Sequence, residues 1–292
     1  MPITKKLLIL YSYFILPLFF TIFIFLYPLL QAFYLAFTNT DLVLGHSDFI
    51  GIENFIKVYQ DKFFWSSVQN TIAWTISRVF LLFLLGLGLA LLLNEKIRGQ
   101  ALFRTLCLIP WAVMPVIAAL TWKWMYAPHY GVISIILMKI GLISSPISWL
   151  ADPSLALPAV IIASLWRDIP FVALMFLSGL QSIPPELIEA ALIDGAGILQ
   201  RFKNIMLPQL KAVIVVVLLW MTIWSFNSFD IVFVMTKGGP GNATMLLGIY
   251  TWLMSFEWFT PGYASAIGIV MTILLFIYVI IFVKVTKIRV GG

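Results

Sequence analysis

Six long apolar runs with few charged residues constrain this chain more than any other feature of its sequence. They cover about residues 11–35, 68–93, 104–126, 155–180, 212–235 and 262–284. A helix needs roughly 20 apolar residues to cross a bilayer, and each run is long enough. Only 10% of the residues are charged, whereas soluble domains carry about 25%. We therefore predict an all-α integral membrane protein with six transmembrane helices, forming one domain over residues 1–292.

The distribution of basic residues predicts the orientation of these helices. Lys5 and Lys6 precede an apolar run that continues to about Phe37, well beyond the roughly 7–15 residues of a signal-peptide core, so we expect a retained helix. Placing the N-terminus in the cytoplasm puts both ends and most basic side chains on that side, as the positive-inside rule requires. The cytoplasmic set is Lys5, Lys6, Lys96, Arg98, Arg104, Arg201, Lys203, Lys211, Lys284, Lys287 and Arg289, and the outer set is Lys57, Lys62, Lys139 and Lys237.

Several chemistries are excluded by what the sequence lacks. The single cysteine, Cys107, permits no intrachain disulfide, and His46 and His129 are the only imidazoles, so we expect no metal or haem site. The phosphate-cradling pattern G-x-x-x-x-G-K-[ST] is absent. The net charge is +6, and the basic residues lie beside the apolar runs, an arrangement that suits lipid headgroups better than nucleic acid. Any energised process would therefore need a partner that binds the nucleotide.

The interval Pro184–Pro208 is too polar to be a span. Ser182 and the two following prolines favour a helix start, and Gly195 and Gly197 favour a break, because glycine adopts the positive φ of a helix end. A second apolar face resumes at Ile198. The pattern predicts a short helix, a glycine corner and another short helix in the cytoplasm. An amphipathic segment that rests on lipid headgroups is an equal alternative from these residues alone.

Two polar stretches fall inside predicted spans, where charged side chains are candidates for function. In the fourth span, Trp166 and Phe171 could stack on a sugar ring while Arg167 and Asp168 satisfy its hydroxyls. The alternative is an ion pair that only orders the helices. In the fifth span the polar stretch contains Trp224, Ser225, Asn227, Ser228 and Asp230. Serine and asparagine in a span are more often helix–helix contacts.

Three residues of the second span have structural interpretations. Arg78 either extends toward an interface or pairs with Asp168 or Asp230. Gly86 and Gly88 are expected to allow close helix packing rather than to bind a ligand.

The segment from Glu189 to Pro208 resembles the EAA signature of the inner-membrane permease subunits of bacterial ABC importers. The matching positions are Glu189, Ala190, Ala191, Asp194, Gly195, Ala196, Phe202, Ile205, Leu207 and Pro208. Other stretches, such as Phe49–Phe55, Leu180–Pro184 and Gly238–Pro240, resemble the carbohydrate-uptake branch, and within it the first permease subunit of maltose and glycerol-3-phosphate transporters.

This resemblance implies a type I importer permease in the bacterial inner membrane that is not itself an enzyme. Its implied partners are a second permease, a dimer of ATPase subunits that binds ATP and Mg²⁺, an extracytoplasmic solute-binding protein and membrane lipid. It implies that 184–208 couples to the ATPase and that a sugar-like solute passes the stretches Trp166–Phe171 and Trp224–Ser228. Relatives often have glycine where Asp168 stands, which leaves the solute open. An autonomous transporter or channel, or a structural membrane subunit, are the alternatives.

Overall fold

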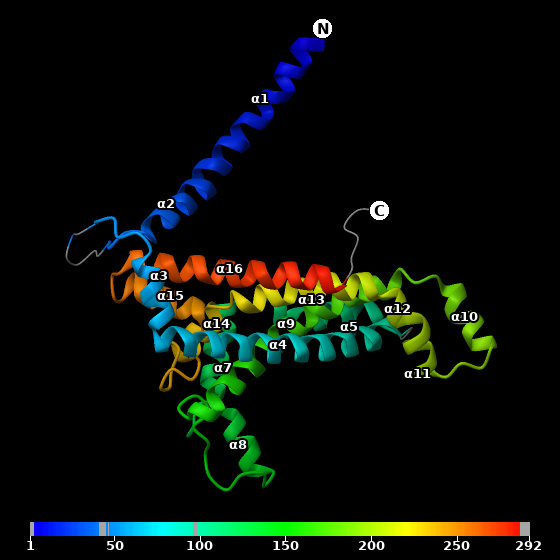
Figure 1. Ribbon diagram of the computed structural model, residues 1–292. Coiled ribbons are helices and arrows are strands. Elements are labelled where there is room, and N and C mark those ends of the chain that lie inside the picture. The colour runs from blue at the N-terminus through cyan, green and yellow to red at the C-terminus, as the bar shows by residue number, and fades with distance from the viewer. Residues whose placement is uncertain (1–2, 41–44, 46, 96–97, 287–292) are drawn as a thin grey trace. The chain divides into compact units, whose positions relative to one another are not determined.

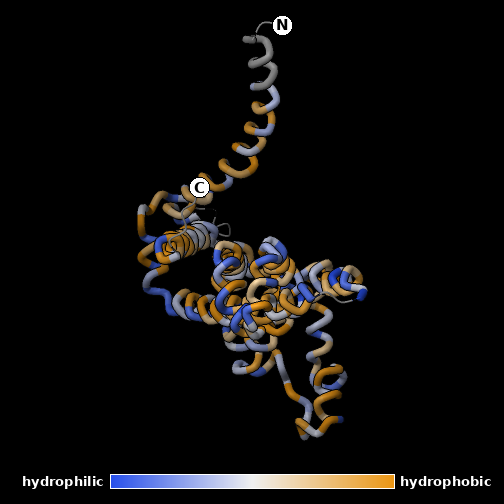
Figure 2. The backbone as a smooth tube through the Cα atoms, turned by 90° about the vertical axis from the view of Figure 1, so that its right-hand side faces the viewer, coloured by the Kyte–Doolittle hydropathy of each residue, from blue (hydrophilic) through white to orange (hydrophobic). Residues whose placement is uncertain are grey.

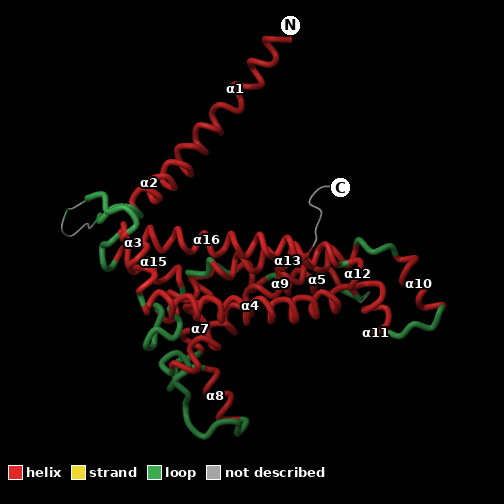
Figure 3. The backbone as a smooth tube through the Cα atoms, in the orientation of Figure 1, coloured by secondary structure: helices red, strands yellow, loops and turns green. Residues whose placement is uncertain are grey.

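The computed structural model describes residues 3–40, 45, 47–95 and 98–286, with the backbone alone for 3–10 (Figure 1). Within these residues the regular structure is helical, and the pairing of Thr38 with Phe49 is an isolated bridge (Figure 3). Lys96, Lys287, Arg289 and His46 lie outside the described residues, as do the side chains of Lys5 and Lys6. The helices, with the π-helical turns η1 and η2, are α1 (Ile3–Thr21), η1 (Ile22–Leu26), α2 (Tyr27–Leu35), α3 (Glu53–Gln60), α4 (Lys62–Asn94), α5 (Gln100–Cys107), α6 (Ile109–Ala112), α7 (Pro115–Met125), α8 (Val132–Lys139), α9 (Pro153–Gln181), α10 (Pro185–Ile193), α11 (Ile198–Arg201), η2 (Phe202–Met206), α12 (Leu207–Gln209), α13 (Lys211–Phe226), α14 (Asp230–Thr236), α15 (Leu247–Phe256) and α16 (Pro261–Thr286).

Five of the six predicted apolar runs correspond to helical stretches long and apolar enough to cross a membrane. These are Tyr11–Leu35, Lys62–Asn94, Pro153–Gln181, Lys211–Thr236 and Pro261–Thr286. Many of their large apolar side chains are exposed, including Leu84 at 55% and Ile162 at 50%. Figure 2 shows hydrophobic residues in orange along the helices. Exposed apolar surface on this scale is expected of helices that face lipid.

The remaining run, predicted at about 104–126, is not one continuous helix. The helical stretches Gln100–Ala112 and Pro115–Met125 meet at 86°, and counting this bent pair as one span gives six. Pro115 disfavours helical backbone at the residue before it, and Met114 is extended, with φ −56° and ψ 139°. Val113 is also extended. The break therefore follows from a proline whose effect on its predecessor the hydrophobic pattern does not register.

The described chain divides into two compact units, of which the first comprises Met1–Trp65 and Tyr250–Leu274. Two polar side chains organise it. Buried Asn54 donates to the carbonyls of Ala36 at 3.0 Å and Thr38 at 2.9 Å, which ties α3 to the end of α2.

The second organising side chain of this unit is Asp61, between α3 and α4. Its carboxylate accepts hydrogen bonds from the hydroxyls of Tyr250 and Tyr263 and from the amide of Phe63. Partial burial raises the pKa of the Asp61 carboxyl, but these hydrogen bonds together outweigh burial, and the pKa lies below its ordinary value of 3.8.

The second unit, Ser66–Ile249 with Leu275–Gly292, contains a layer in which α4, α9 and α13 run side by side (Figure 1). Glycines allow the close approach. A Cβ on Gly86 of α4 would stand 2.6 Å from Val172 Cγ1 on α9, and one on Gly179 of α9 would stand 2.8 Å from Leu210 Cδ2 beside α13. The predicted packing role is confirmed for Gly86. Gly88 does not have this role within the described chain, because a Cβ there would meet no atom within 4 Å.

Candidate functional site

A cavity of about 270 Å³ lies in the second unit where α4, α7, α9, α13 and α14 meet. Its lining combines charged groups, amide and hydroxyl groups and one large exposed aromatic ring, Trp224, which is 54% exposed. Binding sites for small polar solutes combine apolar surface with a few placed polar groups in this way. The lining residues are Arg78, Pro115, Ser164, Arg167, Asp168, Ile223, Trp224, Asn227, Ser228, Phe229, Asp230 and Ile231.

The cavity wall between α13 and α14 is backbone that leaves the helix. The α-helix ends at Phe226, residues 227–229 are not helical, and α14 starts at Asp230. The Asn227 side chain donates to the carbonyl of Ile223 at 2.9 Å, so it caps the helix whose continuation it interrupts. The amide of Ser228 donates to the carbonyl of Ser225 at 3.1 Å. The polar stretch that the sequence places inside the fifth span is therefore a local unwinding at the cavity.

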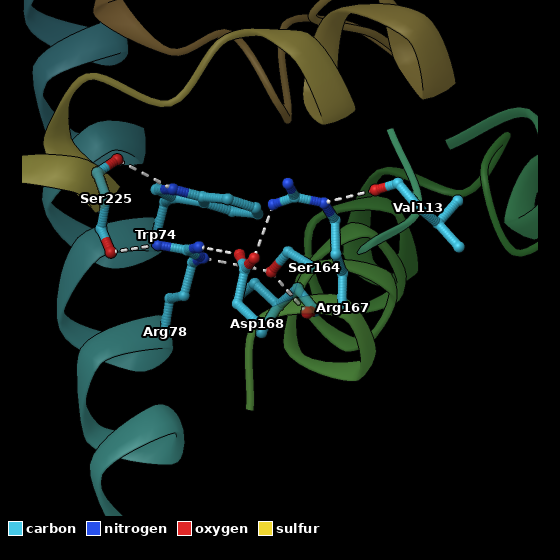
Figure 4. A network of polar contacts seen from close by, with 8 residues as sticks. Trp74, Arg78, Val113, Ser164, Arg167, Asp168 and Ser225 are labelled. Carbon is cyan, nitrogen blue, oxygen red and sulfur yellow. Dashed lines mark hydrogen bonds and ion pairs between the residues drawn. The ribbon is translucent and has the colours of Figure 1, made fainter. Parts of the chain in front are cut away.

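A cluster of three charged side chains, Arg78, Arg167 and Asp168, also lines the cavity (Figure 4). The Asp168 carboxylate accepts from Arg78 through Oδ2 and from Arg167 through Oδ1, the latter at 2.6 Å. Arg167 also donates through Nε to the carbonyl of Val113 at 3.1 Å. That carbonyl belongs to the break between α6 and α7, so Arg167 satisfies a backbone group that the bend leaves outside a helix.

Arg78 is the most enclosed member of this cluster, with its side chain 3% exposed. Its three guanidinium nitrogens donate to Ser164 Oγ, Ser225 Oγ and Asp168 Oδ2. It lies 5.8 Å from the centre of the Trp74 ring, and the Trp74 indole donates to the carbonyl of Ser225 at 3.1 Å. Arg78 on α4 therefore connects α9 to α13. Of the sequence interpretations of Arg78, the pairing with Asp168 is the one the structure has.

The structure brings six of the nine predicted solute-path residues to this cavity. They are Arg167, Asp168, Trp224, Asn227, Ser228 and Asp230. The other three, Trp166, Phe171 and Ser225, are not among the lining residues. Trp166 meets Trp122 edge-on at 6.1 Å, and Phe171 stacks on Trp111 at 4.7 Å. Ser225 is fully buried and accepts from Arg78.

Sequence reasoning did not assign Arg78, Pro115 or Ser164 to the solute path. Ser164 precedes Asp168 by four residues, which places the two side chains on the same helical face, so this spacing was an available signal. Pro115 carried no signal, because its place in the wall depends on the bend before α7. Among the described residues, no three His, Cys, Asp or Glu side chains come together as a metal site would require.

The segment 184–208 has the predicted form of helix, glycine corner and helix. At the end of α10 the amide of Gly195 donates to the carbonyl of Leu192 at 3.1 Å, and that of Ala196 donates to the carbonyl of Ala191 at 2.8 Å. This pair of bonds is a Schellman motif with glycine at the left-handed position, and Gly195 has φ 77°.

The residues of this segment that the sequence assigned to coupling lie mainly on the surface. Glu189, Ala190, Asp194, Gly195 and Pro208 are exposed, Ala196 and Phe202 are half-buried, and Ala191 is buried. Large apolar side chains around the corner are also exposed. They are Ile193 at 87%, Ile198 at 80% and Leu199 at 77%.

A family model described as "Binding-protein-dependent transport system inner membrane component" matches residues 82–290. The chain belongs to this family. The match includes α9, the 184–208 segment and α13. The family resemblance drawn from the sequence is therefore confirmed, and the chain is a multi-pass protein of the cytoplasmic membrane.

Relatives in the family include transport proteins for several glycosides. The chain is 39% identical over 279 residues to the trehalose/maltose transport system permease protein MalF of Thermococcus litoralis, covering 94% of this chain and 92% of the relative. It is also 39% identical over 249 residues to the sulfoquinovosyl glycerol transport system permease protein SmoG of Agrobacterium fabrum, covering 85% and 80%.

A solved structure shows the same fold. It is a bacterial ABC transporter involved in the import of the acidic polysaccharide alginate, and one of its chains superposes with a TM-score of 0.84 at 21% identity, covering 99% of this chain and 98% of that chain. This likeness, together with the family match, confirms the predicted fold class, an all-α importer permease.

Proposed function

We propose that this protein is a permease subunit of an ATP-driven importer and that its solute is a sugar or a sugar-like glycoside. The observation that carries the proposal is the family match over residues 82–290, which contains every lining residue of the cavity except Arg78 and also contains the exposed two-helix corner. The relatives named for trehalose, maltose and sulfoquinovosyl glycerol support the solute class. An autonomous transporter or channel would not require such a corner.

The corner 184–208 serves, in this proposal, as the element that couples the permease to an ATPase. Glu189 offers an exposed carboxylate, and Ile193, Ile198 and Leu199 offer apolar surface that no other part of the described chain covers. The Schellman bonds around Gly195 satisfy the carbonyls at the end of α10 and define the geometry of the corner. The partner subunits would bind ATP and Mg²⁺ and would lie on the cytoplasmic side, where the basic residues place this loop.

The cavity serves as the solute path. Trp224 presents an exposed ring face suited to the apolar side of a sugar ring. Asn227, Ser228 and Asp230 offer hydrogen-bonding groups from the unwound segment. Alternating access would open this cavity to each side of the membrane in turn, with a second permease subunit completing the path and an extracytoplasmic binding protein delivering the solute.

Reconstitution of the purified complex tests this function. Proteoliposomes should accumulate radiolabelled trehalose or maltose only when ATP is present on the side of the membrane that the ATPase subunits face and the binding protein is present on the other side. Glu189→Lys should abolish uptake while the subunit stays assembled, because it reverses the charge that faces the partner. Glu257→Lys, an exposed carboxylate outside the corner, is the matched control and should retain uptake. Transport by the isolated chain without ATP, or normal uptake by Glu189→Lys, would contradict the proposal.

A further inference from the structure

The formal charges around the cavity balance. Arg78 and Arg167 contribute two positive charges, and Asp168 and Asp230 contribute two negative charges. The charges are not paired one to one, because Asp168 forms ion pairs with both arginines. Asp230 is exposed at the start of α14 and forms no ion pair with another described residue.

Arg78 differs from Arg167 in how its donors are used. All three nitrogens of Arg78 donate to protein groups, and its side chain is 3% exposed. Arg167 donates through Nε and Nη1, its Nη2 donates to no other described residue, and its side chain is 15% exposed. Arg167 therefore has a donor available for a solute, whereas Arg78 contributes a positive charge to the cavity and an ion pair with Asp168.

An unpaired carboxylate in so enclosed a place would be costly, since removing one member of a buried ion pair leaves the other uncompensated. Arg78 compensates the charge of the Asp168 carboxylate, so that this carboxylate does not face the cavity as an unpaired charge. It also fixes the position of Asp168, through which Arg167 is oriented.

We propose that Arg78 is a positioning residue that sets the charge selectivity of the cavity, so that the cavity favours uncharged hydroxyl-rich solutes over anionic and cationic ones. This inference rests on the proposed function, because it assumes that the cavity is the solute path. It adds the class of solute that the membrane subunit accepts, independently of the selection made by a binding protein.

Direct binding to the membrane complex tests the proposal. The assembled complex in lipid nanodiscs, without the binding protein, is examined by saturation-transfer NMR with glucose, glucuronate and glucosamine at about pH 6.5, where an amino group is mainly protonated. The three probes share one ring and differ in charge. The readout is the affinity for glucuronate divided by the affinity for glucosamine, a ratio that a general loss of binding does not alter.

Four variants separate charge from folding. Arg78→Met should leave the cavity with a net negative charge and shift the ratio toward glucosamine by roughly tenfold, as expected for one charge at several ångströms in a partly screened site. Asp168→Asn should shift the ratio toward glucuronate by a similar factor. The double variant R78M/D168N restores the balance and should return the ratio to the wild-type value. Arg98→Met, an equal change of charge at an exposed position outside the lining, should leave the ratio unchanged.

Each result decides a different question. Ratios that stay constant across the single variants, or a double variant that does not recover the wild-type ratio, would refute the role of Arg78 while leaving the solute path intact. Failure of all three probes to bind wild type and every variant would instead refute the solute path itself, and with it the proposed function.

Discussion

Replacing Gly195 with alanine should loosen the corner between α10 and α11 through the backbone alone. Gly195 has φ 77°, in the left-handed region, and a Cβ there would meet no atom within 4 Å, so no side-chain clash contributes. The left-handed conformation costs an L-residue roughly 1–2 kcal/mol. The two Schellman hydrogen bonds, donated by Gly195 and Ala196, should therefore open roughly fivefold to thirtyfold more often, since about 1.4 kcal/mol is a factor of ten.

A second glycine in the same corner provides the matched control. Gly197 has φ −66°, which any residue adopts, and a Cβ there would lie 3.9 Å from Gln200 Oε1. Gly197→Ala restricts the unfolded chain by about 0.4–1 kcal/mol, which offsets the loss of a preferred residue at the start of α11. We expect it to be nearly neutral.

Amide hydrogen exchange over residues 185–201 measures both changes directly. Exchange at Gly195→Ala should rise by the factor given above at the two Schellman amides, whereas Gly197→Ala should match the wild type. In the assembled complex the same loosening should lower the solute imported per ATP hydrolysed. Equal exchange in the two variants would show that the corner does not depend on the left-handed conformation, and the reasoning would fail.

Three further predictions concern packing, pH and the solute path. Gly86→Ala should lower the free energy of unfolding by about 1–3 kcal/mol through overpacking, because its Cβ would meet Val172, whereas Gly88→Ala should be neutral. Thermal unfolding in detergent measures both changes, and equal melting temperatures of the two variants would contradict this prediction. Asp61→Asn should destabilise the protein above about pH 4, and the difference in stability from wild type should shrink as pH falls through the lowered pKa of Asp61. Melting scans at several pH values measure this difference, and a difference independent of pH would exclude the charge of Asp61 as its cause. Trp224→Ala should raise the solute concentration for half-maximal uptake by about twofold to thirteenfold, for an aromatic contact of about 0.5–1.5 kcal/mol. Trp166 does not line the cavity, so Trp166→Ala should raise this concentration less, and the reverse order would place the path elsewhere.

The sequence predicts those features that depend on local patterns. Apolar runs identify the spans because lipid requires a long uncharged helix, and the glycine corner is predictable because a left-handed residue at a helix end is almost a property of glycine itself. The pairing of Arg78 was not predictable in the same way. Arg78 and Asp168 are 90 residues apart, and Asp230 was an equally acceptable partner for a buried arginine. Only the packing of α4 against α9, made close by Gly86, decides between them.

The aromatic side chains show a second limit of sequence reasoning. Trp166, Arg167 and Asp168 are consecutive, so their side chains leave the helix about 100° apart. Arg167 and Asp168 reach the cavity, and Trp166 turns to Trp122 instead. Nearness in sequence to a charged pair was therefore a poor guide to which ring lines the cavity, whereas Trp224 lies on a different helix and lines it.

Both interruptions of predicted spans border this cavity. Pro115 follows the break between α6 and α7, and Asn227 begins the break between α13 and α14, and both residues line it. Non-helical backbone at membrane depth is tolerated only where it is buried in protein or lines a cavity, because lipid cannot satisfy its polar groups. Arg167 satisfies the carbonyl of Val113 at the first break, and the side chain of Asn227 satisfies that of Ile223 at the second. The convergence of two such breaks on one cavity therefore supports the proposal that the solute path lies there, on physical grounds that do not depend on any relative.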